Sequence, residues 1–297
     1  MIKNLNLDKI FQILLIILAF LMPLTVFGGN LIIVVICILW LFSGSYKYKL
    51  DQIVNNKLML ASILFFCLHV VGLLWTNDLA WGMHITHKMW YFIGLFPILY
   101  TIVRKDYIRH YISAFLLAIS FTEVCSYLVW FEIIEPFKNA TIQNPTPFMS
   151  HISYNPILVI AIYIVLHELL FNKKLKTLKF SIYSFLTISM TMNMFITGGR
   201  AGQVMFFAML VLLIFQFFNN QRIKPLLVTL FLIPGVFFSA YITSDLFQQR
   251  VDGALDNLVI YSEHKQTPVG ERLTFALNSW EIIKKHPIIG VGTGDFP

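Results

Sequence analysis

Residues 203–243 read QVMFFAMLVLLIFQFFNNQRIKPLLVTLFLIPGVFFSAYIT, and this stretch decides the fold class of the chain. It holds two runs of apolar residues, at 203–218 and 225–243, joined by a short turn that carries Arg222 and Lys224. A helix needs about 20 predominantly apolar residues to cross the hydrocarbon core of a bilayer. Each run therefore predicts one membrane-spanning helix.

Further apolar runs precede this pair along the chain. They lie near 10–27, 31–43, 58–75, 89–103, 111–134, 152–171 and 180–196. Charged residues make up only 12% of the chain, whereas a soluble domain has roughly 25%. The sequence thus predicts an all-α fold, a polytopic bundle of about nine transmembrane helices. Three cysteines lie within these runs and are interpreted as small buried apolar residues: Cys37, Cys67 and Cys125.

The basic residues orient this bundle. If the N-terminus is inside, the basic residues of the inner segments are Lys3, Lys9, Lys47, Lys49, Lys57, Arg104, Lys105, Arg109, Lys173, Lys174, Lys176, Lys179, Arg222 and Lys224. The short outer segments hold only Lys88, Lys138 and Arg200. Because short cytoplasmic loops are enriched in Lys and Arg, we expect a transmembrane bundle over 1–243 with its N-terminus inside and an outer segment over 244–297. The net charge of +7 then reflects topology, and no nucleic-acid-binding motif is present.

The motif TGGRAG, residues 197–202, lies between two predicted spans at the outer face. An Arg at the bilayer centre costs about 2.5–3.5 kcal/mol on insertion scales, so Arg200 is expected at the boundary or in a wet cavity. The paired Gly198 and Gly199 let the backbone approach a ligand closely, and the planar guanidinium matches a phosphate group. The alternative is a short turn whose Arg contacts lipid headgroups.

A polar tail, residues 244–297, follows the last predicted span. Thr267 and Pro268 predict the N-cap and first residue of a helix, and His286, which stands before a proline, predicts its end. An apolar stripe recurs at helical spacing and consists of Leu273, Leu277, Trp280 and Ile283. We expect an amphipathic helix on the outer surface, with Arg272 in its first turn.

Two further polar residues are candidates for chemistry. His151 follows a Pro-rich outer loop at the head of a span, where it is interpreted either as a helix cap or as a base that reaches an outer cavity. Glu123 lies inside the fifth predicted span, and a carboxylate there is a functional candidate by default. Two interpretations of Glu123 remain: it is the proton site of a transporter, or it is a hydrogen-bonded Glu inside the bundle. The histidines show no metal-ligand spacing, so no metal site is predicted.

Two motifs resemble the O-antigen ligase/polymerase superfamily of bacterial envelope glycosyltransferases: TGGRAG and RLTFALNSWEIIKKHPIIGVGTGDF, residues 272–296. The resemblance implies an all-α, GT-C-like enzyme of the bacterial inner membrane with a periplasmic active face. The implied donor is a glycan on undecaprenyl pyrophosphate. The implied acceptor is lipid A-core for a ligase, another repeat unit for a polymerase, or a hydroxyl group for a protein O-oligosaccharyltransferase.

The resemblance also implies roles for single residues. Two outer-face arginines of the family hold the pyrophosphate, and the matching positions here are Arg200 and Arg272. The residues predicted to contact the substrate are Gly198, Gly199, His151 and Trp280. The implied transfer needs no metal ion or other cofactor, because cationic side chains stabilise the charge of the leaving group.

One element of the ligase pattern does not occur within residues 1–297. The ligases carry a His beyond the Gly-rich turn that activates or positions the acceptor hydroxyl. We therefore expect a truncated chain that is inactive alone, in which residues 244–297 form the first part of a longer periplasmic loop. The leading interpretation is an O-antigen ligase. The alternatives are the related polymerase or O-oligosaccharyltransferase, a secondary transporter or flippase, and a non-catalytic remnant that binds carrier lipid.

Overall fold

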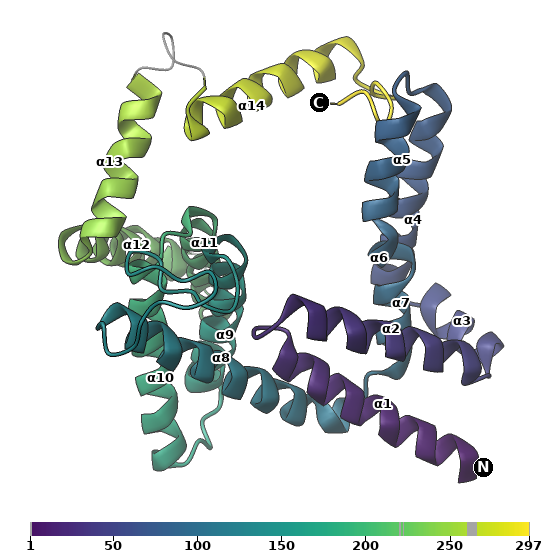
Figure 1. Ribbon diagram of the computed structural model, residues 1–297, viewed down its shortest axis with the longest axis horizontal. Helices are drawn as coiled ribbons and strands as arrows, with labels where there is room; N and C mark the ends of the chain where they lie inside the picture. Colours follow the sequence, from purple (N-terminus) through teal and green to yellow (C-terminus); the bar gives the residue numbers. More distant parts are fainter. Residues whose placement is uncertain (1, 220, 222, 260–265, 297) are drawn as a thin grey trace. The chain divides into compact units, whose positions relative to one another are not determined.

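A computed structural model of the chain describes residues 2–219, 221, 223–259 and 266–296. These residues form helices joined by turns, and no β-strand occurs among them apart from an isolated bridge between Thr141 and Asn144. The predicted all-α fold is therefore confirmed. The chain divides into two compact units, which we describe separately (Figure 1).

Unit 1 comprises Met1–Leu15, Asn30–Arg109 and Asn257–Pro297. Its helices are α3 (Tyr46–Val54), α4 (Lys57–Val71), η1 (Gly72–Trp75), α5 (Leu79–Lys88), α6 (Trp90–Ile93), α7 (Leu95–Ile102), η2 (Lys105–Tyr107) and α14 (Pro268–Lys285). Two more helices, α1 (Ile2–Leu21) and α2 (Val26–Phe42), contribute residues to both units. Helix α4 packs against α3, α5, α6 and α7 (Figure 1), so it forms the centre of the cluster that carries the polar segment before α5.

Unit 2 comprises Ile16–Gly29 and His110–Asp256. Its helices are α8 (Ile108–Trp130), α9 (His151–Phe171), α10 (Thr177–Ile196), α11 (Arg200–Phe217), α12 (Ile223–Thr243) and α13 (Asp245–Val259). Helix α9 packs against both α10 and α11 and supplies the largest share of the buried core residues. Its fully buried apolar residues are Leu158, Val159, Ala161, Ile162 and Val165. A helix that is apolar around most of its circumference is expected to be buried in this way.

Five helical segments of the described chain are long and apolar enough to cross a membrane: Lys57–Trp75, Lys105–Trp130, His151–Phe171, Arg200–Phe217 and Ile223–Thr243. A sixth is added if α2 and α3, which meet at 117°, form one broken span. The sequence predicted about nine. Three predicted spans are absent from this set of six. Helix α1 begins with polar residues, and Gly94 separates α6 from α7. Helix α10 carries Ser, Thr and Asn side chains that lower its hydropathy.

The outward faces of the spans carry large exposed apolar side chains. On α12, Phe231 is 74% exposed and Leu226 is 58% exposed. Contiguous apolar surface on this scale does not occur on soluble monomers and indicates contact with lipid. The chain is therefore a multi-pass membrane protein.

The predicted boundary at residue 243 coincides with the end of α12. Beyond it, α13 is tied back to α12, because the Tyr241 hydroxyl donates a hydrogen bond to Asp252 Oδ1 (2.7 Å). Most of α13 belongs to unit 2, whereas α14 belongs to unit 1. The assignment of residues 244–297 to an outer segment stays a prediction.

Candidate functional site

The TGGRAG motif forms the connection between α10 and α11 in unit 2. Thr197 is the extended residue that ends α10, Gly199 is the N-cap of α11, and Arg200 is the first residue of that helix. Residues 197–199 are buried and Arg200 is half-buried. A polar loop that is buried must have its backbone groups satisfied by neighbouring side chains.

Two asparagine side chains hold this loop. Asn144 Oδ1 accepts a hydrogen bond from the backbone N–H of Gly198 (2.8 Å). Asn155, fully buried on α9, accepts from the Thr197 hydroxyl (2.8 Å) and donates to the Gly199 carbonyl oxygen (3.4 Å). The loop conformation is thus set by α9 and by the segment before it.

The glycines are required by close packing inside the protein. A β-carbon at Gly199 would lie 2.5 Å from Asn155 Nδ2 and 2.7 Å from the carbonyl oxygen of His151. A β-carbon at Gly202 would overlap the side chain of Asn155. The paired glycines were predicted to allow a close approach of ligand. The structure shows that α9 approaches Gly199 closely, and that Asn144 and Arg250 approach Gly198. Contact of Gly198 and Gly199 with substrate stays a prediction.

A second arginine of unit 2 lies against the same loop. Arg250 is half-buried on α13, and a β-carbon built at Gly198 would lie 3.1 Å from its Nη2 atom. His151 also borders the loop, because its carbonyl oxygen would lie 2.7 Å from a β-carbon at Gly199. We define the loop site as Asn144, His151, Asn155, Thr197, Gly198, Gly199, Arg200 and Arg250.

The sequence predictions covered half of this site. Gly198, Gly199, Arg200 and His151 were predicted, and the structure brings them together. Arg250, Asn144 and Asn155 were missed. Asn residues in loops and at helix ends are too common to single out, and Arg250 lies 50 residues beyond Arg200 with no motif around it. Only the packing of α9 and α13 against the loop reveals them.

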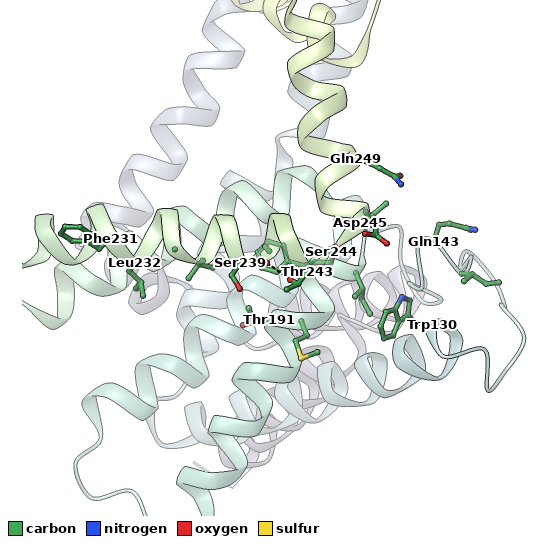
Figure 2. A pocket seen from close by; sticks show the side chains of 18 residues that line it. Trp130, Gln143, Thr191, Phe231, Leu232, Ser239, Thr243, Ser244, Asp245 and Gln249 are labelled. Carbon is green, nitrogen blue, oxygen red and sulfur yellow. Dashed lines mark hydrogen bonds between the residues drawn. The ribbon is translucent and has the colours of Figure 1, made fainter.

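A pocket of about 800 Å³ opens beside the loop site in unit 2 (Figure 2). Most of its lining residues come from α10 and α12, and the large apolar ones among them include Met192, Phe195, Phe231, Leu232 and Val236. In Figure 2 the labelled side chains Asp245, Gln143 and Gln249 lie at the opposite end from Phe231. We call this cavity the α10–α12 pocket; it is apolar along the spans and polar at one end.

Three residues that line the α10–α12 pocket are direct sequence neighbours of the loop site. Gln143, Ile196 and Gln249 line the pocket. Each is followed directly in the sequence by a residue of the loop site. An amphiphile with an apolar chain in the pocket would therefore have its polar group near the arginines.

Glu123 lies on α8, and its side chain is buried inside unit 2. Its Oε1 atom accepts a hydrogen bond of 2.5 Å from the Ser189 hydroxyl of α10. This geometry agrees with the interpretation of a hydrogen-bonded Glu inside the bundle. Among the described residues, no three His, Cys, Asp or Glu side chains come together in a group that could hold a metal ion.

Arg272 and Trp280 lie together on α14 in unit 1. The helix begins as predicted, because the Thr267 side chain accepts a hydrogen bond from Gly270 N (3.0 Å) and Pro268 is the first helical residue. It ends as predicted at His286. Arg272 is exposed, and Trp280 in the apolar stripe is 59% exposed. The pairing of Arg272 with Arg200 stays a prediction.

The Gly-rich turn after α14 docks on the segment between α4 and α5, within unit 1 (Figure 1). The Thr293 hydroxyl donates to the carbonyl oxygen of His69 (2.7 Å). The Asp295 carboxylate accepts from the backbone N–H groups of Asn77 (2.8 Å) and Asp78 (2.9 Å). Gly292 adopts a left-handed φ of 97°, which favours glycine. The Gly-rich turn is thus used to dock the chain inside the protein.

These contacts hold the pKa of Asp295 below its ordinary value, chiefly through the backbone hydrogen bonds from Asp78 and Asn77. Since the pKa is lower in the folded state, the docking contributes fully at pH values above the ordinary pKa of Asp, about 3.9. The contribution is lost as the pH falls through the lowered value.

We expect Asp295→Asn to undock the turn at neutral pH and to increase hydrogen exchange at the amides of Asn77 and Asp78 several-fold. The neutral amide accepts weaker hydrogen bonds than a carboxylate does. Exchange measured by mass spectrometry checks this result, with Asp51→Asn on α3 as the control. Unchanged exchange at both amides would contradict the docking role of the carboxylate.

Comparison with known families gives one match. Residues 185–297 match the family model described as O-antigen ligase. The matched range begins within α10, extends beyond the end of α14 and contains both sequence motifs. The resemblance drawn from those motifs is therefore confirmed. No curated protein and no solved structure matches the chain.

Proposed function

We propose, from the match of residues 185–297 to the O-antigen ligase family, that this chain transfers a glycan from undecaprenyl pyrophosphate to lipid A-core. The superfamily is one of glycosyltransferase-type membrane enzymes. The proposal adds the donor, the acceptor, the bacterial inner membrane and a periplasmic active face. The distribution of Lys and Arg between short loops supports that orientation.

The observation that carries the proposal is the loop site beside the α10–α12 pocket. A polyprenyl pyrophosphate has a long apolar chain and a doubly charged head. The pocket offers apolar walls for the chain, and the loop site offers the guanidinium of Arg200 for the head. Arginine suits this role because its planar fork can bind two phosphate oxygens at once.

The chemistry follows from the donor. The acceptor hydroxyl attacks the anomeric carbon and forms a new glycosidic bond, while the bond from that carbon to the pyrophosphate oxygen breaks. The leaving pyrophosphate takes the electron pair, and the hydroxyl proton passes to a base or to solvent. Negative charge therefore grows on the pyrophosphate in the transition state. Fixed guanidinium groups that stabilise this charge would accelerate the transfer.

Arg272 and Trp280 of α14 are also proposed to contact the substrate, because they belong to the second motif of the resemblance. In this proposal Arg272 supplies a further guanidinium to the pyrophosphate and Trp280 contacts the glycan. Both side chains are exposed within unit 1 and so are available for a ligand. His151, at the loop site, is proposed to contact the substrate.

Deleting the gene for this protein in the organism that encodes it tests the proposal. Loss of a ligase should leave long glycan on the carrier lipid and lipid A-core without glycan. Both products can be measured, by mass spectrometry of the lipid-linked fraction and by gel analysis of lipopolysaccharide. Core capped with a single repeat would instead indicate a polymerase. Unchanged lipid-linked and core-linked glycan would overturn the proposal.

A further inference from the structure

Helix α13 is anchored to unit 2 at its first turn. The Ser244 hydroxyl, at the junction with α12, donates to the carbonyl oxygen of Phe195 (2.8 Å) and accepts from the backbone N–H of Phe247 (3.2 Å). Phe247 is 3% exposed, and its ring packs 5.1 Å from the ring of Phe195 and 5.4 Å from that of Phe237. These contacts join the start of α13 to the end of α10, directly before the TGGRAG motif.

A second attachment fixes the direction in which α13 leaves the membrane-spanning part. Asp252 accepts the hydrogen bond of Tyr241 on α12. Two attachments about one and a half turns apart prevent the helix from rotating about its axis. Arg250, one turn beyond Phe247, is therefore held toward the loop, where its Nη2 atom would lie 3.1 Å from a β-carbon at Gly198.

The charge of Arg250 has no counterion in the part of the chain that the structure describes. Neither the ion pair of Arg104 with Asp8 nor that of Lys284 with Glu281 includes Arg250. The carboxylate closest along α13, Asp252, is used by Tyr241. A half-buried guanidinium beside a buried loop loses hydration, and this cost is normally offset by an anion or by hydrogen-bond acceptors. The half-buried position of Arg250 therefore favours the binding of an anionic ligand.

Arg250 belongs to the same loop site as Arg200. Gly198, which Arg250 touches, stands two residues before Arg200 in a loop that Asn144 and Asn155 hold rigid. The positive charges of both residues favour an anionic ligand at this loop. A diphosphate offers enough acceptor oxygens for both.

We propose that Arg250 is a phosphate-binding residue of this site and that it makes the site selective for a polyprenyl diphosphate over the monophosphate. The proposal rests on the proposed function, because it concerns the same donor. Arg200 binds one phosphate group and Arg250 binds the other. The monophosphate, with a single phosphate group, engages only one of the two guanidinium groups.

Binding of undecaprenyl pyrophosphate and undecaprenyl phosphate to the purified protein in nanodiscs tests this proposal. A hydrogen bond to a charged group is strong enough that Arg250→Ala should weaken pyrophosphate binding by about tenfold or more. Binding of the monophosphate should change less than about threefold. The pyrophosphate affinity of Arg250→Lys should lie between those of the wild type and Arg250→Ala, because Lys keeps the positive charge but lacks the planar guanidinium group.

Lys224→Ala is the matched control, since Lys224 is an exposed cation at the opposite end of α12. It should leave both affinities unchanged. Thermal unfolding of each variant separates loss of binding from loss of fold. If Arg250→Ala unfolds, Arg250→Gln, which retains a polar side chain, replaces it in the binding experiment.

The outcomes distinguish the two proposals. If the wild type binds the pyrophosphate and folded Arg250 variants bind it equally well, the role of Arg250 is overturned while the donor assignment stands. If Arg250→Ala weakens both ligands to the same degree, the selectivity is overturned. If the wild type binds neither ligand, the proposed function fails, and this inference fails with it.

Discussion

Valine in place of Gly202 is expected to disrupt the loop site and to cost the folded protein roughly 1–3 kcal/mol or more. A β-carbon at this position would overlap the Asn155 side chain and lie 2.9 Å from the Asn155 carbonyl carbon. That neighbour is backbone of the central helix α9, so it cannot move aside as a flexible side chain can. Asn155 would then lose its hydrogen bonds to Thr197 and Gly199.

Thermal unfolding in detergent measures this effect, and a graded series sharpens it. Gly202→Ala should be destabilised less than Gly202→Val, because it adds a smaller side chain to the same contact. Gly253→Ala on α13 is the control, since nothing lies within 4 Å of a β-carbon there. Alanine is the better helix former by about 1 kcal/mol, so this variant should be as stable as the wild type or more so. Wild-type stability of Gly202→Val would contradict the close contact of α9 and α11.

Removing the guanidinium of Arg200 is expected to lower the rate of glycan transfer by about 10²–10³-fold, the usual loss for a donor that stabilises transition-state charge. Arg200→Lys should retain part of the rate, because it keeps the charge but loses the planar fork. The rate can be followed as glycan moves from the carrier lipid to lipid A-core in membranes that contain the full protein. Arg104→Ala is the control, because it removes a half-exposed ion pair with Asp8 that contributes little.

Glu123→Gln distinguishes the transferase from a transporter. The Gln side chain can still accept the hydrogen bond from Ser189, but it cannot bind and release a proton. A transferase should keep most of its activity after this change, whereas a proton-coupled transporter should lose it. Greater loss from Glu123→Gln than from Arg200→Ala would favour the transporter.

The predictions that succeeded depend on residues close together in the sequence. The limits of α14 followed from Thr267, Pro268 and His286, because helix caps involve groups within a few residues of the helix end. The nine predicted spans illustrate the opposite case. Apolar runs show where helices form, but a bend such as the 117° turn between α2 and α3 depends on how the chain packs.

The sequence by itself determined the helical membrane fold, the ends of α14 and the family motifs, because apolar periodicity and capping act over one or two turns of chain. Tertiary structure alone decided which groups meet. Asp295 caps the amide of Asn77, 218 residues away, and Arg250 reaches Gly198 because α13 is anchored by Ser244 and Phe247. Such contacts arise from the packing of whole helices, and no local pattern encodes them. The TGGRAG motif thus marked the loop, and only its neighbours revealed that Arg250 belongs to it.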